Sequence, residues 1–180
     1  MKTLLSAALA TVCLLTSSAF ATDIKLANWN IQTLTYSGDP QTVFPGDYVR
    51  TSADYADLRR WRDLVGANVF LLQEVTSPAA IDEVFPIADG WQHCISGQYA
   101  KDQGTGEGPI CTLAGAAPKP MGDSRAQYTA VAWRDQAGLS VGPLVDYAAL
   151  TGKSADTDGT IRVLRWGLYV TVKAGSSELR

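Results

Sequence analysis

Two short apolar runs that end in polar side chains constrain the fold of this chain more than any other feature. Residues 24–31 form a mostly apolar run, and residues 69–72 are continuously apolar, as in a strand that is covered on both faces. Between the runs, Thr51 or Ser52 can cap a helix that Gly66 ends. The order strand, helix, strand predicts two parallel strands joined by a right-handed crossover.

The helix between these runs carries apolar residues at spacings of three and four, which predicts one buried face and a solvated charged face. The apolar positions are Tyr55, Leu58, Trp61, Leu64 and Val65. We expect Trp29 and Trp61 to lie in the core and not to contact a substrate.

The rest of the chain continues as an α/β pattern with more strands than helices. Ser77 and Pro78 start a second helix, as cap and first helical residue. Glycine- and proline-rich residues 97–124 are predicted to be one long loop. Further strands are predicted at residues 91–96, 127–134, 139–145 and 162–173, with turns at residues 153–159 and 175–177. We expect the later strands to pair as antiparallel hairpins.

The first 21 residues have the features of a secretory signal peptide. Lys2 supplies a positive start, residues 4–15 are apolar, and Ala19-Phe20-Ala21 forms an A-x-A cleavage site. The apolar stretch is too short to span a bilayer. We therefore expect a mature chain of residues 22–180, of single-domain length, that is secreted or periplasmic and has no membrane anchor.

Charge argues against a strong electrostatic grip on nucleic acid. The whole chain has a net charge of −3, and loss of Lys2 with the signal peptide makes it −4. No basic run occurs, although a bound metal can supply local positive charge that the net charge does not show.

Cysteine usage predicts one disulfide. Cys13 leaves with the signal peptide, so Cys94 and Cys111 remain in an exported chain. Closing a loop of this size stabilises a fold by about 3 kcal/mol in the chain-entropy model. Two free thiols, or a partner cysteine beyond Arg180, are the alternatives.

Asn30 and Glu74 end the two leading strands and are 44 residues apart. The carboxyl ends of parallel strands meet at one edge of a sheet, where ligands of α/β proteins bind. A carboxylate suits Mg²⁺, and an amide can donate to a phosphate oxygen or touch the metal shell. Asn28 lies on the same side of its strand as Asn30. The alternative is that these side chains satisfy loop backbone.

The segments Asn28-Trp29-Asn30-Ile31 and Gln73-Glu74-Val75, each after an apolar strand, resemble the N-terminal signature of the endonuclease/exonuclease/phosphatase superfamily. These are metal-dependent phosphoesterases related to pancreatic deoxyribonuclease, and the chain is most similar to exported bacterial members. The resemblance implies an α/β fold: a four-layer sandwich of two mixed β-sheets flanked by helices, with residues 22–180 as its N-terminal part.

The resemblance also implies roles for the two residues. Glu74 would hold Mg²⁺ or Mn²⁺, and Asn30 would fix the phosphate beside the metal. The two catalytic histidines and the Asp-x-Asn motif of the superfamily are expected beyond Arg180, so residues 22–180 alone are expected to be inactive. The sequence around His93 matches neither of the contexts in which the catalytic histidines of the family occur, so His93 is expected to be an ordinary strand residue.

Three arginines are candidates for substrate binding, because guanidinium groups bind phosphate as planar bidentate donors. Arg134 follows a strand that resembles a family strand ending in arginine or lysine, and Arg162 and Arg165 precede another strand. The expected activity is that of a monomeric phosphodiesterase or nuclease-type hydrolase acting on a phosphate ester, with nucleic acid as one option. The alternatives are a phosphomonoesterase acting on sugar or lipid phosphates and a non-catalytic binding module.

Overall fold

Helices and strands alternate in the first half of the chain, and strands dominate the second half. The structure is a computed structural model. It describes residues 23–36, 50–102, 104–106, 108–112, 127–147, 153–155, 161–163 and 167–180. The predicted signal peptide lies outside these ranges. Within them, no helix is long and apolar enough to cross a membrane.

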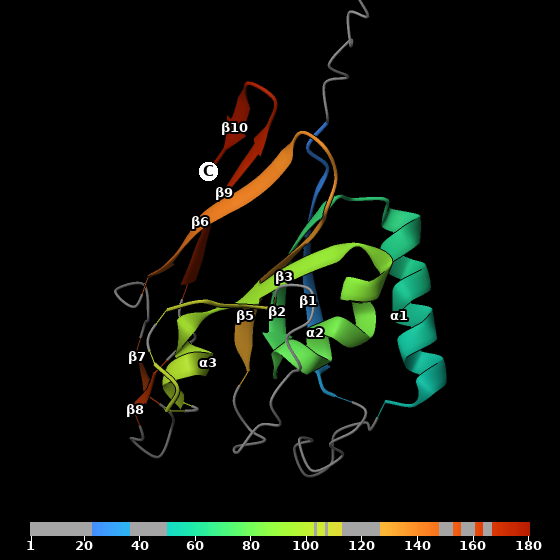
Figure 1. The fold of residues 1–180 in the computed structure, drawn as a ribbon. Helices are drawn as coiled ribbons and strands as arrows, with labels where there is room; N and C mark the ends of the chain where they lie inside the picture. Colours follow the sequence, from blue (N-terminus) through green and yellow to red (C-terminus); the bar gives the residue numbers. More distant parts are fainter. Residues whose placement is uncertain are drawn as a thin grey trace, which may run out of the picture.

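The elements follow one another as in Figure 1. The helices are α1 (Ser52–Val65), α2 (Pro78–Val84), the 3-10 helix η2 (Ile87–Asp89) and α3 (Gly97–Asp102). The strands are β1 (Leu26–Leu34), β2 (Val69–Val75), β3 (Trp91–Ile95), β4 (Ile110–Thr112), β5 (Tyr128–Arg134), β6 (Leu139–Tyr147), β7 (Lys153–Ala155), β8 (Ile161–Val163), β9 (Gly167–Ala174) and β10 (Ser177–Leu179).

The larger sheet is mixed and has five strands in the order β1-β2-β5-β3-β4. The strands β1 and β2 are parallel, in register from Leu26 opposite Val69 to Asn30 opposite Gln73. The other neighbours in this sheet are antiparallel. The predicted parallel pairing of the first two strands is therefore confirmed, and β1 lies at an edge of this sheet.

The smaller sheet has the order β10-β9-β6 and is antiparallel, and β7 pairs with β8 as a separate antiparallel ribbon. The expected antiparallel hairpins are confirmed. One predicted strand at residues 162–173 is instead two strands, β8 and β9, and β7 lies within the segment predicted as a turn.

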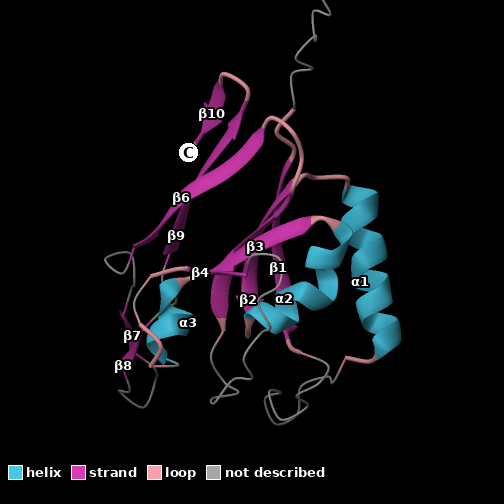
Figure 2. Ribbon diagram, viewed as in Figure 1, coloured by secondary structure: helices cyan, strands magenta, loops and turns pink. Residues whose placement is uncertain are grey.

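The two faces of the five-stranded sheet are covered by different layers, as Figure 2 shows: α1 and α2 on one face, and β6 and β9 of the smaller sheet on the other. The strand β2 explains this arrangement, since its side chains alternate between the layers. Phe70 and Leu72 face the helices, whereas Val69 and Leu71 face the smaller sheet. The chain is therefore a mixed α/β protein with two β-sheets, and the continuously apolar run is a strand covered on both faces.

The first helix begins and ends where its capping residues predict. Thr51 is the N-cap in a capping box: its Oγ1 accepts from the N–H of Asp54, and the Asp54 carboxylate accepts from the N–H of Thr51 at 2.6 Å. Gly66 closes the helix in a left-handed conformation with a φ of 64°.

Only the first two residues of the predicted apolar face of this helix pack against the core. Tyr55 is buried and Leu58 is partly buried, but Trp61 is 62% exposed, and Leu64 and Val65 are also exposed. Arg62 is buried in their place, since its guanidinium donates to the carbonyl of Val84 and lies over an aromatic ring of the core. The prediction that Trp61 lies in the core is therefore wrong.

Trp29 does pack against the core, as predicted. Its ring centroid lies 6.1 Å from that of Phe70 and 6.5 Å from that of Phe85. The side chains of Ala27 and Trp29 face the helices, so Asn28 and Asn30, which alternate with them, face the other way.

The predicted loop at residues 97–124 is wrong in its first part. The helix α3 begins at Gly97 and buries Tyr99, whose ring lies 5.3 Å from that of Tyr128. The strand β4 then pairs with β3. Tertiary packing thus orders a glycine-rich segment that has no apolar periodicity of its own. Residues 113–124 lie outside the described ranges.

The predicted disulfide is confirmed. Cys94 on β3 and Cys111 on β4 are directly opposite in the ladder, with an S–S distance of 1.99 Å. The bond joins the short edge strand β4 to the sheet. Disulfides persist mainly in oxidising compartments, which agrees with an extracellular or periplasmic location.

Candidate functional site at the ends of β1 and β2

The structure brings Asn30 and Glu74 into direct contact. The amide nitrogen of Asn30, Nδ2, donates to Oε1 of Glu74 at 3.1 Å. One position earlier on β2, Nε2 of Gln73 donates to Oδ1 of Asn28 at 2.6 Å. One amide–carboxylate pair and one amide–amide pair therefore link the carboxyl ends of the two parallel strands.

Both strands bulge at this level. Between the pairs Asn30–Gln73 and Leu34–Val75, β1 has three residues and β2 only one. On the other side of β2, the register with β5 shifts between Leu72 and Val75. Bulges of this kind often lie next to active sites, where they redirect a side chain.

The bulges coincide with backbone strain. Gln32, Thr33 and Glu74 have φ angles of 50°, 53° and 64°, and they are the non-glycine residues with positive φ in the described ranges. Such conformations cost about 1 to 3 kcal/mol each and gather at functional sites. The strain at the ends of β1 and β2 therefore marks this edge of the sheet independently of the side-chain types.

Side chains from outside the two strands hold the strained segment of β1. The guanidinium of Arg50 donates to the carbonyls of Ile31 at 2.8 Å, Gln32 at 2.7 Å and Thr33 at 2.5 Å. The side-chain amide of Gln127 donates to Oγ1 of Thr33 at 2.5 Å. Sequence reasoning missed both residues, because neither is part of a motif, and the only sequence hint for Arg50 is its place directly before the helix cap.

The orientation of the Asn30 amide is defined at both ends. Its oxygen, Oδ1, accepts from the backbone N–H of Gln32 at 3.0 Å, while its nitrogen donates to Glu74. One proton of Nδ2 is used by that contact, and an amide nitrogen has two. The second N–H of Nδ2 can donate a hydrogen bond to a phosphate oxygen.

The site at the ends of β1 and β2 fits a metal ion that takes some of its ligands from a substrate, and not one that protein side chains hold alone. In the part of the chain that the structure describes, no group of three or more His, Cys, Asp or Glu residues could hold a metal ion. Mg²⁺ commonly binds through one or two carboxylates and takes its other ligands from water and phosphate. The partly buried carboxylate of Glu74 is compatible with such a site.

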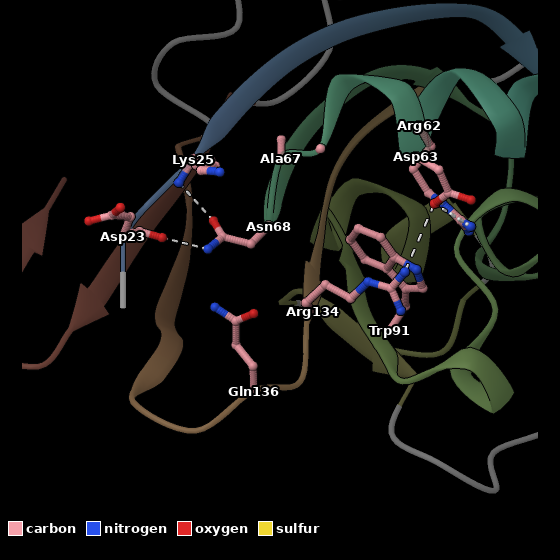
Figure 3. A pocket seen from close by; sticks show the side chains of 10 residues that line it. Asp23, Lys25, Arg62, Asp63, Ala67, Asn68, Trp91, Arg134 and Gln136 are labelled. Carbon is pink, nitrogen blue, oxygen red and sulfur yellow. Dashed lines mark hydrogen bonds and ion pairs between the residues drawn. The ribbon is translucent and has the colours of Figure 1, made fainter. Parts of the chain in front are cut away.

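Arg134 does not join Asn30 and Glu74. In the ladder between β3 and β5, Arg134 is opposite Trp91. It lies beyond the start of β2, whereas Glu74 is near the end of that strand. Its guanidinium lies 4.4 Å from the ring centroid of Trp91 and donates to the carbonyl of Asp89 at 2.6 Å. Arg134 lines a separate hollow of about 590 Å³. Figure 3 shows it there with Lys25, Asp63 and Asn68 among the other lining residues.

The other arginine candidates are not placed by the structure. Arg162 belongs to β8, but its side chain is outside the described part, and Arg165 lies outside the described residues altogether.

His93 lies in the core, away from the candidate site. It is fully buried and pairs with Ala132, which is level with Phe70 of β2. Its Nε2 is 3.6 Å from Oδ1 of Asp82. The imidazole is the main reason why the pKa of Asp82 lies below its usual range. Burial raises this pKa, and the hydrogen bond from the N–H of Ile87 lowers it. The contact thus joins β3 to α2.

Comparison of the chain with family models, curated protein sequences and solved structures gave no match. The chemical reading of this site therefore depends on its geometry and on the residues that form it.

Proposed function

We propose that the chain supplies the metal- and phosphate-binding edge of a divalent-metal-dependent phosphoesterase, of the phosphodiesterase or nuclease type. The observation that carries the proposal is the 3.1 Å contact between Asn30 and Glu74 at the strained ends of two parallel strands. In the corresponding fold, residues 22–180 form the N-terminal part of a four-layer sandwich.

An exposed apolar surface supports a partial domain. Trp61, Leu64 and Val65 of α1 are exposed, and Leu26 of the neighbouring edge strand β1 is 45% exposed. Trp61 and Val65 line a hollow of about 550 Å³ along β1. Exposed apolar side chains that line a common hollow, as Trp61 and Val65 do here, are often covered by further chain or by a partner.

In the proposed reaction, the Glu74 carboxylate would hold Mg²⁺ or Mn²⁺. Such a metal would supply positive charge that offsets the negative charge of the phosphate and polarises it. Asn30 donates to the Glu74 carboxylate and so orients it, and the second Nδ2 proton binds a phosphate oxygen. The partial negative charge that develops on that oxygen in the transition state strengthens this hydrogen bond.

The proposal is tested by Mn²⁺ titration of residues 22–180, comparing the native sequence with Glu74→Gln. We expect the native protein to bind Mn²⁺ and Glu74→Gln to lose the site, because the substitution keeps the size of the side chain and removes its charge. Glu83→Gln on α2 is the matched control and should bind as the native protein does. Equal Mn²⁺ affinity in all three proteins would contradict the proposal.

Turnover separates the proposed activity from its alternatives. A chromogenic phosphodiester and a phosphomonoester are incubated with residues 22–180 and with any longer form of the protein. Hydrolysis of the diester that a chelator and Glu74→Gln both abolish supports the phosphodiesterase, and preference for the monoester supports a phosphatase. Binding of phosphate esters without hydrolysis by every form indicates a non-catalytic binding module.

A further inference from the structure

We propose that Arg50 is a positioning residue for the Asn30–Glu74 pair. The inference rests on the function proposed above and deepens it, because it names the side chain that keeps the metal-binding edge in its working geometry. Arg50 acts on the pair through the backbone of the bulge.

The bulge needs an external support. Gln32 and Thr33 are successive left-handed residues, and neither side-chain type favours that conformation, Thr33 least because it is β-branched. The fork of Arg50 reaches three successive carbonyls, those of residues 31, 32 and 33. These bonds turn the three carbonyls toward one cation, which an extended strand with alternating carbonyls cannot do.

A continuous chain of hydrogen bonds connects this support to the site. The carbonyl of Gln32 accepts from Arg50, and the N–H of the same residue donates to Oδ1 of Asn30 at 3.0 Å. The Nδ2 of Asn30 in turn donates to Glu74. If the bulge relaxed, the N–H of Gln32 would move, and the Asn30 amide would lose the contact that decides which of its ends faces the carboxylate.

Arginine is suited to this role and lysine is not. A guanidinium is planar and carries five donors in a rigid fork, whereas an ammonium is a point charge with three donors on a single nitrogen. The backbone of Arg50 is anchored as well, since the next residue, Thr51, is the capping residue of α1. Both features favour a fixed support over a flexible surface arginine.

The test compares Arg50→Lys with Arg60→Lys, a control substitution at an exposed arginine on α1. In Arg50→Lys we expect faster hydrogen exchange at the N–H of Gln32 and at the Asn30 side-chain amide, both followed by NMR. We also expect Mn²⁺ affinity to fall by about 10- to 100-fold, the range for residues that orient a metal ligand. Arg60→Lys should change neither quantity.

Two further measurements separate positioning from a general loss of structure. In Arg50→Ala, millimolar guanidinium should restore Mn²⁺ affinity and methylammonium should not. In the unmodified protein, the N–H of Gln32 should exchange more slowly than a free backbone amide, a result that needs no variant to fold. Exchange of Gln32 at the free rate would overturn the inference, and so would unchanged Mn²⁺ affinity in Arg50→Lys when Glu74→Gln does lose Mn²⁺.

The outcome also distinguishes this inference from the proposed function. If Glu74→Gln binds Mn²⁺ as the native protein does while Arg50→Lys still frees the Asn30 amide, the phosphoesterase proposal fails and the positioning of Asn30 by Arg50 stands. If Glu74→Gln loses Mn²⁺ and Arg50→Lys leaves both the amide and the affinity unchanged, the positioning role fails alone.

Discussion

At the scale of single residues, two polar contacts stand out: one at the strained ends of β1 and β2, and one between β3 and α2. Asn30, Gln32 and Glu74 satisfy one another at the strained strand ends. Asp82, which is partly exposed on α2, faces the buried imidazole of His93 on β3. The first arrangement has the features of a binding site, and the second joins two elements.

The Asp82–His93 contact predicts a pH dependence of stability. The pKa of Asp82 is lowered in the folded protein, mainly by His93, so the folded state binds fewer protons than the unfolded state. The resulting stability is present above the unfolded pKa of about 4 and is lost as the pH falls through the folded pKa. Asp82→Asn should therefore unfold at lower urea concentration than the native protein at pH 6, and the two should converge at strongly acidic pH.

Asp57→Asn on the exposed face of α1 is the control for this experiment. It should follow the native protein at every pH in urea titrations. A constant difference between the native protein and Asp82→Asn from neutral to strongly acidic pH would show that the ionised carboxylate adds no stability.

At the scale of elements, local signals define where the helices begin, and contacts between elements define which of their faces is buried. The capping box of α1 involves only residues three apart in the chain. The burial of Arg62, in contrast, depends on the carbonyl of Val84 and on Trp91, which belong to other elements.

Removal of the cap should therefore have a local and predictable cost. Thr51→Ala deletes the hydroxyl that accepts from the N–H of Asp54, and the free energy of unfolding should fall by about 1 kcal/mol. Ser52→Ala, one residue further and inside the helix, should change it by less than about 0.5 kcal/mol, as for most exposed substitutions. Urea unfolding measures both, and equal losses in the two variants would show that Thr51 is not the effective cap.

At the scale of the whole molecule, the five-stranded sheet lies between the helices α1 and α2 on one face and the smaller sheet on the other. Cys94 is fully buried in the cluster between the two sheets, beside Val69, Val131 and Val172. Its disulfide to Cys111 holds β4 against β3, so the covalent bond and the apolar packing stabilise the same region.

Reduction of the disulfide should destabilise the whole fold. The bond spans a sequence separation of 17 residues, and on the chain-entropy model its loss costs about 3 kcal/mol. The midpoint of urea unfolding should fall when reductant is added to the native protein. A Cys94→Ala/Cys111→Ala double variant should have a low midpoint that reductant does not change. A native midpoint that is insensitive to complete reduction would contradict this prediction.

Sequence alone was sufficient for features that depend on near neighbours or on residue type. Thr51 and Gly66 delimit α1, the apolar run of β2 is covered on both faces, and Cys94 joins Cys111. The meeting of Asn30 with Glu74 was also predictable, because two parallel strands joined by a helix must present their carboxyl ends at the same edge.

Only the tertiary structure decided features that depend on register and on contacts far apart in the chain. Arg50 reaches the bulge only because β1 has extra residues there, which no local pattern marks. Arg134 is separated from Glu74 because β5 runs antiparallel to β2, so that the end of β5 lies beside the start of β2. Trp61 is exposed because Arg62 finds its partners on other elements. In each case the deciding interaction energy comes from contacts between segments that are distant in the chain. A single sequence does not specify how such segments are placed relative to one another.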